Sequence, residues 1–286
     1  MCSAPTTSIN LRDRIVGIEQ KVPLLDGRMV PYVNLDNAAS TPALRDVADA
    51  IERFLPYYSS VHRGTGFKSR LSTVAYDQAH EIILRFVGAD PETNTCIFGK
   101  NSTEALNKLA YRFPLEADAV IITTQMEHHS NDLPWRSRAK VVHIRTTADG
   151  RFDEDDFDQQ LAKYGERVAL VAVTGASNVS GFIQPIHRLA RKAHAAGAMF
   201  LVDAAQLAPH RAEDMKADDD PEHLDFVVLS AHNMYAPFGT GALIGPQVIF
   251  LQGPPEYRGG GTVDIVTLDE VSWAGMPDRD EAGSPN

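Results

Sequence analysis

Short apolar runs rich in valine and isoleucine alternate along the chain with segments of helical periodicity, and this alternation restricts the fold most. The runs are apolar throughout, which indicates strands of a sheet that is covered on both faces. Strand–helix alternation predicts an α/β domain, a three-layer and mostly parallel sheet with helices on both faces. The expected strands are 119–124, 141–144, 168–173, 199–202, 226–229 and 242–244, and the expected helices are 71–86, 103–111, 132–138, 154–163 and 186–195.

The bulk properties exclude several classes of protein. The formal net charge of -11 argues against a nucleic-acid partner, and no apolar run approaches the length that crosses a bilayer. The two cysteines, Cys2 and Cys96, exclude a disulfide framework, and Cys96 is expected in a buried strand. The acidic runs 153–156 and 218–220 indicate solvated loops, so no metal site is expected. We therefore expect a cytoplasmic protein without a membrane partner.

Polar and titratable residues follow four of the expected strands. In an open α/β sheet, ligands bind outside the carboxyl ends of the strands. Each residue alone has an ordinary structural explanation: Asp203 as a helix cap, His128 as a surface histidine, and Ser102 as a helix start that also suits an anion. Together they predict a ligand site. The four strand-end segments are Glu127–Asn131, Ser177–Asn178, Asp203–Gln206 and Ser230–Asn233.

Several longer segments resemble the class V aminotransferase family of fold-type I pyridoxal-phosphate enzymes, and in particular its cysteine desulfurase and selenocysteine lyase branch. The resemblance runs in order from about residue 30 to the last residue. It implies an N-terminal segment at 1–30, a large cofactor-binding domain at 31–286, and the absence of the family's small C-terminal domain. The segments are NLDNAASTP (34–42), VHRG (61–64), NSTEALN (101–107), QMEHHSN (125–131), ASNVSG (176–181), VDAAQ (202–206), SAHNMYAPFGTGAL (230–243) and EAGSPN (281–286).

The resemblance implies pyridoxal 5'-phosphate as cofactor and assigns roles to individual residues. Asp203 is expected to pair with the pyridine nitrogen and keep it protonated, while His128 stacks on the ring and handles protons. Asn178 and Gln206 are expected near the phenolic oxygen or the substrate carboxylate. The phosphate is expected to contact Ser102, Thr103, Ser230 and His232, and Ser284 is expected to reach the phosphate of a partner subunit, which implies a homodimer. His62 and Arg63 are expected near a small amino-acid substrate.

Asn233 departs from the family pattern, because a Schiff-base lysine follows the histidine there. An asparagine amide is neither nucleophilic nor basic, so the covalent step is lost and the chain is predicted to be inactive. Three explanations remain open: an engineered or accidental replacement, a pseudoenzyme that still binds the cofactor, or a different use of the site. Whether the chain is an enzyme is therefore left undecided.

The end of the chain is the second departure. In desulfurases the small C-terminal domain carries the persulfide-forming cysteine and a carboxylate-binding arginine, and neither is assigned here. The chain is thus expected to be a piece of a longer or split protein, with an exposed apolar patch. The alternative function is a non-catalytic regulatory or interaction module with the same fold. A nucleotide-binding domain is disfavoured, because the glycine-rich fingerprints are missing.

Overall fold

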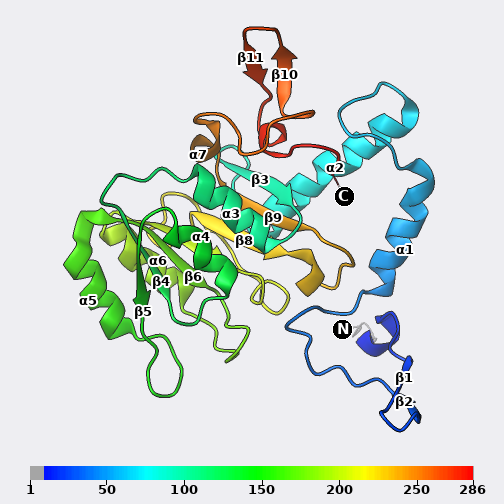
Figure 1. Ribbon diagram of the computed structural model, residues 1–286, viewed down its shortest axis with the longest axis horizontal. Helices are drawn as coiled ribbons and strands as arrows, with labels where there is room; N and C mark the ends of the chain where they lie inside the picture. The colour runs from blue at the N-terminus through cyan, green and yellow to red at the C-terminus, as the bar shows by residue number, and fades with distance from the viewer. Residues whose placement is uncertain (1–9, 286) are drawn as a thin grey trace, which may run out of the picture.

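A seven-stranded sheet organises the protein, and the computed structural model describes residues 10–285 of the chain (Figure 1). The strand order is β3-β9-β8-β7-β6-β4-β5, with β9 antiparallel to both of its neighbours and the five strands from β8 to β5 mutually parallel. The prediction of a mostly parallel α/β sheet is confirmed. The strands are β3 (Asn94–Gly99), β4 (Val120–Thr124), β5 (Lys140–Ile144), β6 (Val168–Thr174), β7 (Met199–Asp203), β8 (Phe226–Ser230) and β9 (Gly241–Pro246).

Alternate residues of each central strand enter two different cores, which is why the strands read as apolar throughout. In β6, Val171 packs into the core shared with α2, α5 and α6, whereas Leu170 packs into the core shared with α3, α4 and α7. Both side chains are fully buried. The sheet is therefore covered on both faces, as expected. The helices are α1 (Arg45–Phe54), α2 (Phe67–Phe86), α3 (Ser102–Arg112), α4 (Leu133–Arg136), α5 (Glu154–Tyr164), α6 (Ile186–Ala195) and α7 (Gln247–Leu251).

Two small hairpins project from this body. Strands β1 (Lys21–Pro23) and β2 (Met29–Pro31) pair in the N-terminal arm, and β10 (Val263–Val266) pairs with β11 (Val271–Trp273). Figure 1 shows both hairpins standing away from the sheet. Most of their side chains are exposed, so their sequences carry no buried apolar pattern.

The fold tests the predictions made for the cysteines and for the acidic runs. Cys96 is a buried strand residue, as predicted, whereas Cys2 lies outside the described residues. Of the two acidic runs expected in solvated loops, 218–220 lies in a turn, whereas 153–156 opens α5, the helix that the sequence predicts at 154–163. Asp153 caps α5 by accepting a hydrogen bond from the Asp156 N–H, and the buried Asp156 carboxylate accepts one from the Arg145 N–H. These acids open a helix because carboxylates stabilise the positive end of its dipole. No helix among the described residues is long and apolar enough to cross a membrane.

Candidate cofactor site at the carboxyl ends of the strands

Asp203 is the most buried charged group at the carboxyl edge of the sheet. It ends β7, its residue is 4% exposed, and its carboxylate accepts a hydrogen bond from the Ala205 N–H at 3.1 Å. Within residues 10–285, no lysine or arginine forms an ion pair with it. Burial raises the pKa of Asp203, and the nearby His128 opposes that rise. A buried carboxylate in this setting favours a cationic or N–H-bearing ligand.

A chain of hydrogen bonds joins the start of α3 to the turn after β4. The Thr103 hydroxyl lies 2.7 Å from the Ser130 hydroxyl, which lies 2.9 Å from His128 Nδ1. These contacts orient the imidazole of His128, which is an exposed residue. Ser102 is the first residue of α3, where free N–H groups and the helix dipole favour an anion.

The segment after β8 contributes a second set of polar groups. The buried Ser230 hydroxyl lies 2.9 Å from His232 Nδ1, which fixes both side chains at the end of the strand. The Ala231 N–H donates to the Thr240 carbonyl, so the chain folds back toward the α3 start, where Gly241 packs against Asn101. Hydroxyl and imidazole groups from two strand ends therefore lie near the start of α3.

Asn233, expected from the sequence at the lysine position, is a buried side chain with its own hydrogen-bond partner. Its Nδ2 donates to the Ala38 carbonyl at 2.9 Å, and Gln206 Nε2 donates to the same oxygen at 2.6 Å. The Thr41 N–H donates to the His232 carbonyl, which holds the 38–41 segment against the site. Asn233 thus anchors the 38–41 segment and provides no amine.

Glu127 connects the ends of two parallel strands, a role that we did not predict. Its Oε1 accepts from the Thr124 hydroxyl at 2.6 Å and the Thr174 N–H at 2.9 Å, and its Oε2 accepts from Asn131 Nδ2 at 2.7 Å. Desolvation raises the pKa of Glu127 to about 8, although all three hydrogen bonds oppose the rise. Its position directly before His128 was the available signal in the sequence.

His62, Arg63 and Ser284 gather elsewhere, around the C-terminal segment. His62 contacts Asp77 at 2.8 Å and Asp278 at 3.2 Å, and Arg63 Nη2 donates to the Gly283 carbonyl at 3.0 Å. Asn178 lies apart from them, exposed in the turn after β6. The predicted residues therefore fall into two groups. The C-terminal group consists of His62, Arg63 and Ser284. The strand-end group consists of the residues that follow the strands, namely Ser102, Thr103, His128, Asn178, Asp203, Gln206, Ser230, His232 and Asn233.

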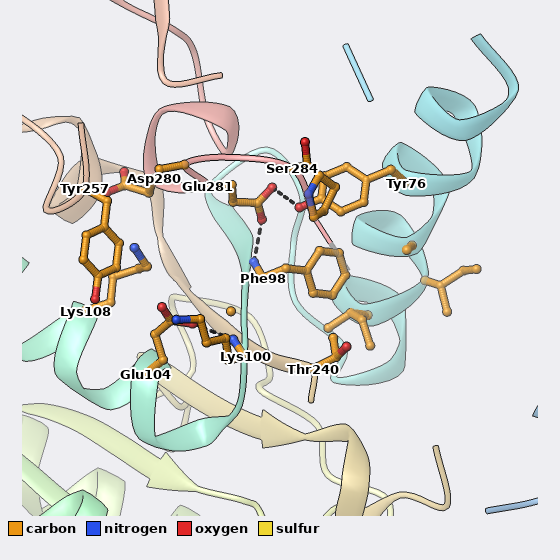
Figure 2. Close-up of a pocket in the computed structure, with 16 residues that line it drawn as sticks. Tyr76, Phe98, Lys100, Glu104, Lys108, Thr240, Tyr257, Asp280, Glu281 and Ser284 are labelled. Atoms are coloured by element: carbon orange, nitrogen blue, oxygen red, sulfur yellow. Dashed lines mark hydrogen bonds between the residues drawn. The ribbon is translucent and has the colours of Figure 1, made fainter. Parts of the chain in front are cut away.

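Ser284 also lines a cavity of about 490 Å³ (Figure 2). In this cavity Glu281 accepts from the Tyr76 hydroxyl and the Phe98 N–H, and Lys108 lies close to Tyr257. Lys100, on the opposite wall, leads into the start of α3. The cavity borders the strand-end group without containing Asp203 or Asn233.

The family model and the similar proteins of known sequence agree on one family. The model of the aminotransferase class-V family matches residues 33–286. A probable cysteine desulfurase of Vibrio cholerae is 36% identical over 90% of this chain and 64% of its own length. A cysteine desulfurase of Haloferax volcanii is 35% identical over 91% of this chain and 62% of its own length. The chain therefore spans less than two thirds of the length of these relatives.

Solved structures agree with the sequence comparison. The apo structure of a cysteine desulfurase from Thermococcus onnurineus has a TM-score of 0.83 at 32% identity, and covers 100% of this chain and 68% of its own. A cysteine desulfurase from Escherichia coli has a TM-score of 0.77 at 29% identity, over 96% of this chain and 67% of its own.

Proposed function

Because this chain belongs to the aminotransferase class-V family and is similar to its cysteine desulfurases, we propose that it binds pyridoxal 5'-phosphate at the strand-end group. The observation that carries the proposal is Asp203, a carboxylate buried at the end of β7 with no cationic side chain paired to it in the described chain. When bound, this cofactor supplies an electron-withdrawing ring that stabilises negative charge on a substrate carbon. The natural substrate class is a small amino acid.

The residues present fit most of this cofactor. Asp203 would hold the proton on the pyridine nitrogen, because a cationic partner offsets the cost of burying its carboxylate. His128 would cover a ring face, held in orientation by Ser130. Hydroxyl and helix N–H donors would bind the phosphate. The four phosphate-binding residues proposed are Ser102, Thr103, Ser230 and His232.

Gln206 and Asn178 would complete the polar surroundings of the ring and the substrate. Gln206 donates through Nε2 to the Ala38 carbonyl, which leaves its side-chain oxygen as an acceptor for a ligand. Asn178 is exposed in its turn, and an approaching substrate carboxylate is a suitable partner for its amide. Both residues would orient ligands rather than transfer protons.

Asn233 limits what this site does. Its side-chain N–H already donates a hydrogen bond to the Ala38 carbonyl, and an amide nitrogen has no basic lone pair. Asn233 therefore neither attaches the cofactor covalently nor removes a proton from the substrate. We therefore propose that the chain as written retains the cofactor without turning over substrate. The Asn233–Ala38 hydrogen bond also favours a second candidate, a non-catalytic module that keeps the fold for regulation or interaction.

A homodimer is the proposed assembly. Arg63, Ser284 and the Gly260–Gly261 turn lie together around the C-terminal segment, in a group separate from Asp203. A second subunit would receive these side chains at its own strand-end group, and the cavity of Figure 2 would then lie beside the subunit interface. Two cysteines in the whole sequence suit the reducing cytoplasm, which is the proposed location.

Cofactor titration tests the binding proposal. Pyridoxal 5'-phosphate should change the absorbance of the chain and raise its melting temperature. Asp203→Asn, which keeps the shape and removes the charge, should weaken binding at least about tenfold, since one lost charged hydrogen bond is worth about 1.5–3 kcal/mol. The exposed Asp158→Asn serves as the matched control and should bind as the unchanged chain does. Unchanged absorbance and melting temperature in the parent chain would refute the proposal.

A further inference from the structure

Two histidines and an aspartate meet at the edge of the sheet opposite to the cofactor site. His194 lies in the last turn of α6, and Asp225 directly precedes β8, whose carboxyl end carries Ser230. His223 lies two residues before Asp225. One side-chain ligand atom from each of the three residues lies within 4.8 Å of the others. The cluster was not predicted, because α6 and β8 bring together positions that are 31 residues apart.

Hydrogen bonds fix the direction in which each imidazole ring points. His194 Nδ1 lies 2.9 Å from the Pro221 carbonyl oxygen, and His223 Nδ1 lies 2.7 Å from the Asp220 carbonyl oxygen. A carbonyl only accepts, so each Nδ1 donates its proton to a backbone oxygen, which leaves Nε2 as the nitrogen of each ring that can bind a metal ion. These two Nε2 atoms face the Asp225 carboxylate, at 2.9 Å for His194 and 3.3 Å for His223. Without an ion each Nε2–H donates to this carboxylate, and a metal ion that binds between these groups displaces those protons.

This arrangement matches the surroundings of histidines that bind metals. A metal-ligating histidine usually donates its other ring N–H to a carbonyl or carboxylate, which sets the tautomer and the ring direction. Zn–N and Zn–O bonds of about 2.0–2.2 Å place neighbouring ligands of a tetrahedral site about 3.3 Å apart. The Nε2–Oδ separations of 2.9 and 3.3 Å are close to that value. We propose that His194, His223 and Asp225 form a binding site for a divalent transition-metal ion of the Zn²⁺ class.

The site is open enough to accept an ion and a water ligand. The histidine side chains are 17% and 19% exposed, while Asp225 is 9% exposed and also accepts from the Phe200 N–H. The imidazole rings are stacked, with centroids 4.2 Å apart and planes at 17°, so ion binding requires them to splay until both lone pairs point at the metal. The ion would tie the end of α6 to the loop before β8.

Zinc titration of the full chain, purified without a histidine tag and without added cofactor, tests this site. We expect one Zn²⁺ per chain by calorimetry, and a melting temperature about 5 °C higher at an ion concentration one hundred times Kd. His194→Gln and His223→Gln should each weaken binding about tenfold or more, since loss of even an indirect contact to a metal site has that effect. The matched control is His143→Gln, because His143 Nε2 pairs with Asp132 at 2.9 Å without a second histidine.

Absence of stoichiometric zinc binding, or equal affinity in the parent chain and both cluster variants, would overturn the proposal. Asp225→Asn is a weaker test, because its carboxylate also holds the Phe200 N–H and its loss disturbs the fold. A zinc-edge X-ray absorption spectrum of the loaded parent chain keeps the test independent of any variant. It should show two imidazole ligands with Zn–N bonds of about 2.0 Å, and any other imidazole count contradicts the site.

Discussion

Glu127 is a residue whose ionisation should affect the proposed cofactor site. Its carboxylate joins the ends of β4 and β6 and lies directly before His128, so its charge state bears on the position of the imidazole. Asp203 adds a like charge nearby, which further favours the protonated form of Glu127. Two acids at the ends of neighbouring strands are thus each held toward the neutral form when no ligand is bound.

Stability should fall as pH rises through the range in which Glu127 ionises. The pKa of Glu127 is about 8 in the folded state and 4.5 ordinarily, so between these pH values only the folded state keeps the proton. The stability that this proton contributes is complete below pH 4.5 and is lost as the pH rises to about 8. In Glu127→Gln, the fall in the free energy of unfolding between low and high pH should be smaller by roughly 1–2 kcal/mol. A fully buried group would give a larger difference, but solvent reaches part of this side chain and screens its charge. Urea unfolding of both proteins at pH 5 and pH 9 measures it. Equal pH dependence in the two proteins would show that Glu127 does not titrate in this range.

At the scale of elements, the sequence predicts the buried strands well and the exposed ones poorly. The six expected strands match β4 to β9 within about two residues at each end, because strands buried on both faces have unbroken apolar sequences. Helix α7 was not predicted although Ile249 and Phe250 are buried in it, because five residues are too short a run to show helical periodicity. The hairpins β1–β2 and β10–β11 and helix α1 were not predicted either. None of them contains a fully buried side chain. The hairpins carry no apolar periodicity, whereas α1 does, since its half-buried Val47, Ile51 and Phe54 recur at helical spacing.

The same limit applies to the candidate site. Residues that follow the strands, such as Asp203 and Ser230, could be placed from the sequence because parallel strands end at one edge. The contacts of Ala38 with Asn233 and Gln206 could not, since they join positions 195 and 168 residues apart. Contacts of this kind depend on how loops fold back, which no local pattern encodes.

Glu281 should anchor the C-terminal segment to α2 and β3. It is a nearly buried carboxylate that accepts hydrogen bonds from Tyr76, from the Phe98 N–H and from His80 Nε2 at 2.9 Å. Glu281→Ala should reduce the free energy of unfolding by about 2–4 kcal/mol, because three part-buried donors lose their partner. Urea unfolding and limited proteolysis after residue 275 measure this. Asp269→Ala, in an exposed turn, is the control and should change little.

His80 makes part of that anchor dependent on pH. Burial alone lowers the pKa of His80, but the hydrogen bond and charge of Glu281 outweigh it and raise the pKa above 6.5. The stabilisation is therefore complete below 6.5 and is lost as pH rises through the raised value. In the Glu281→Ala variant this portion of the pH dependence should disappear.

At the scale of the whole molecule, exposed apolar side chains indicate where another surface belongs. In the β10–β11 hairpin, Ile265 is 63% exposed and Leu268 fully so, on a projection that the body of the protein does not cover (Figure 1). Exposure of large apolar side chains to water is unfavourable, so this hairpin is suited to contact with another protein surface. The C-terminal group with Ser284 lies next to the same part of the chain.

The proposed homodimer therefore predicts the effect of charges on this hairpin. Ile265→Asp together with Leu268→Asp should shift the chain from dimer to monomer in analytical ultracentrifugation, since a charge in an apolar contact is poorly solvated. Leu133→Asp, at an exposed apolar position of α4, is the control and should leave the dimer intact. A parent chain that sediments as a monomer at all concentrations would contradict the dimer.

The most direct measurement of the central claim is the mass of the chain after borohydride reduction with pyridoxal 5'-phosphate. If the site is a cofactor pocket that lacks only its lysine, the parent chain should bind the cofactor reversibly and keep its mass. Asn233→Lys should gain one reduced cofactor, located at position 233 by peptide mapping. No adduct at position 233 in a folded Asn233→Lys variant, or a specific adduct at another lysine of the parent chain, would contradict the account.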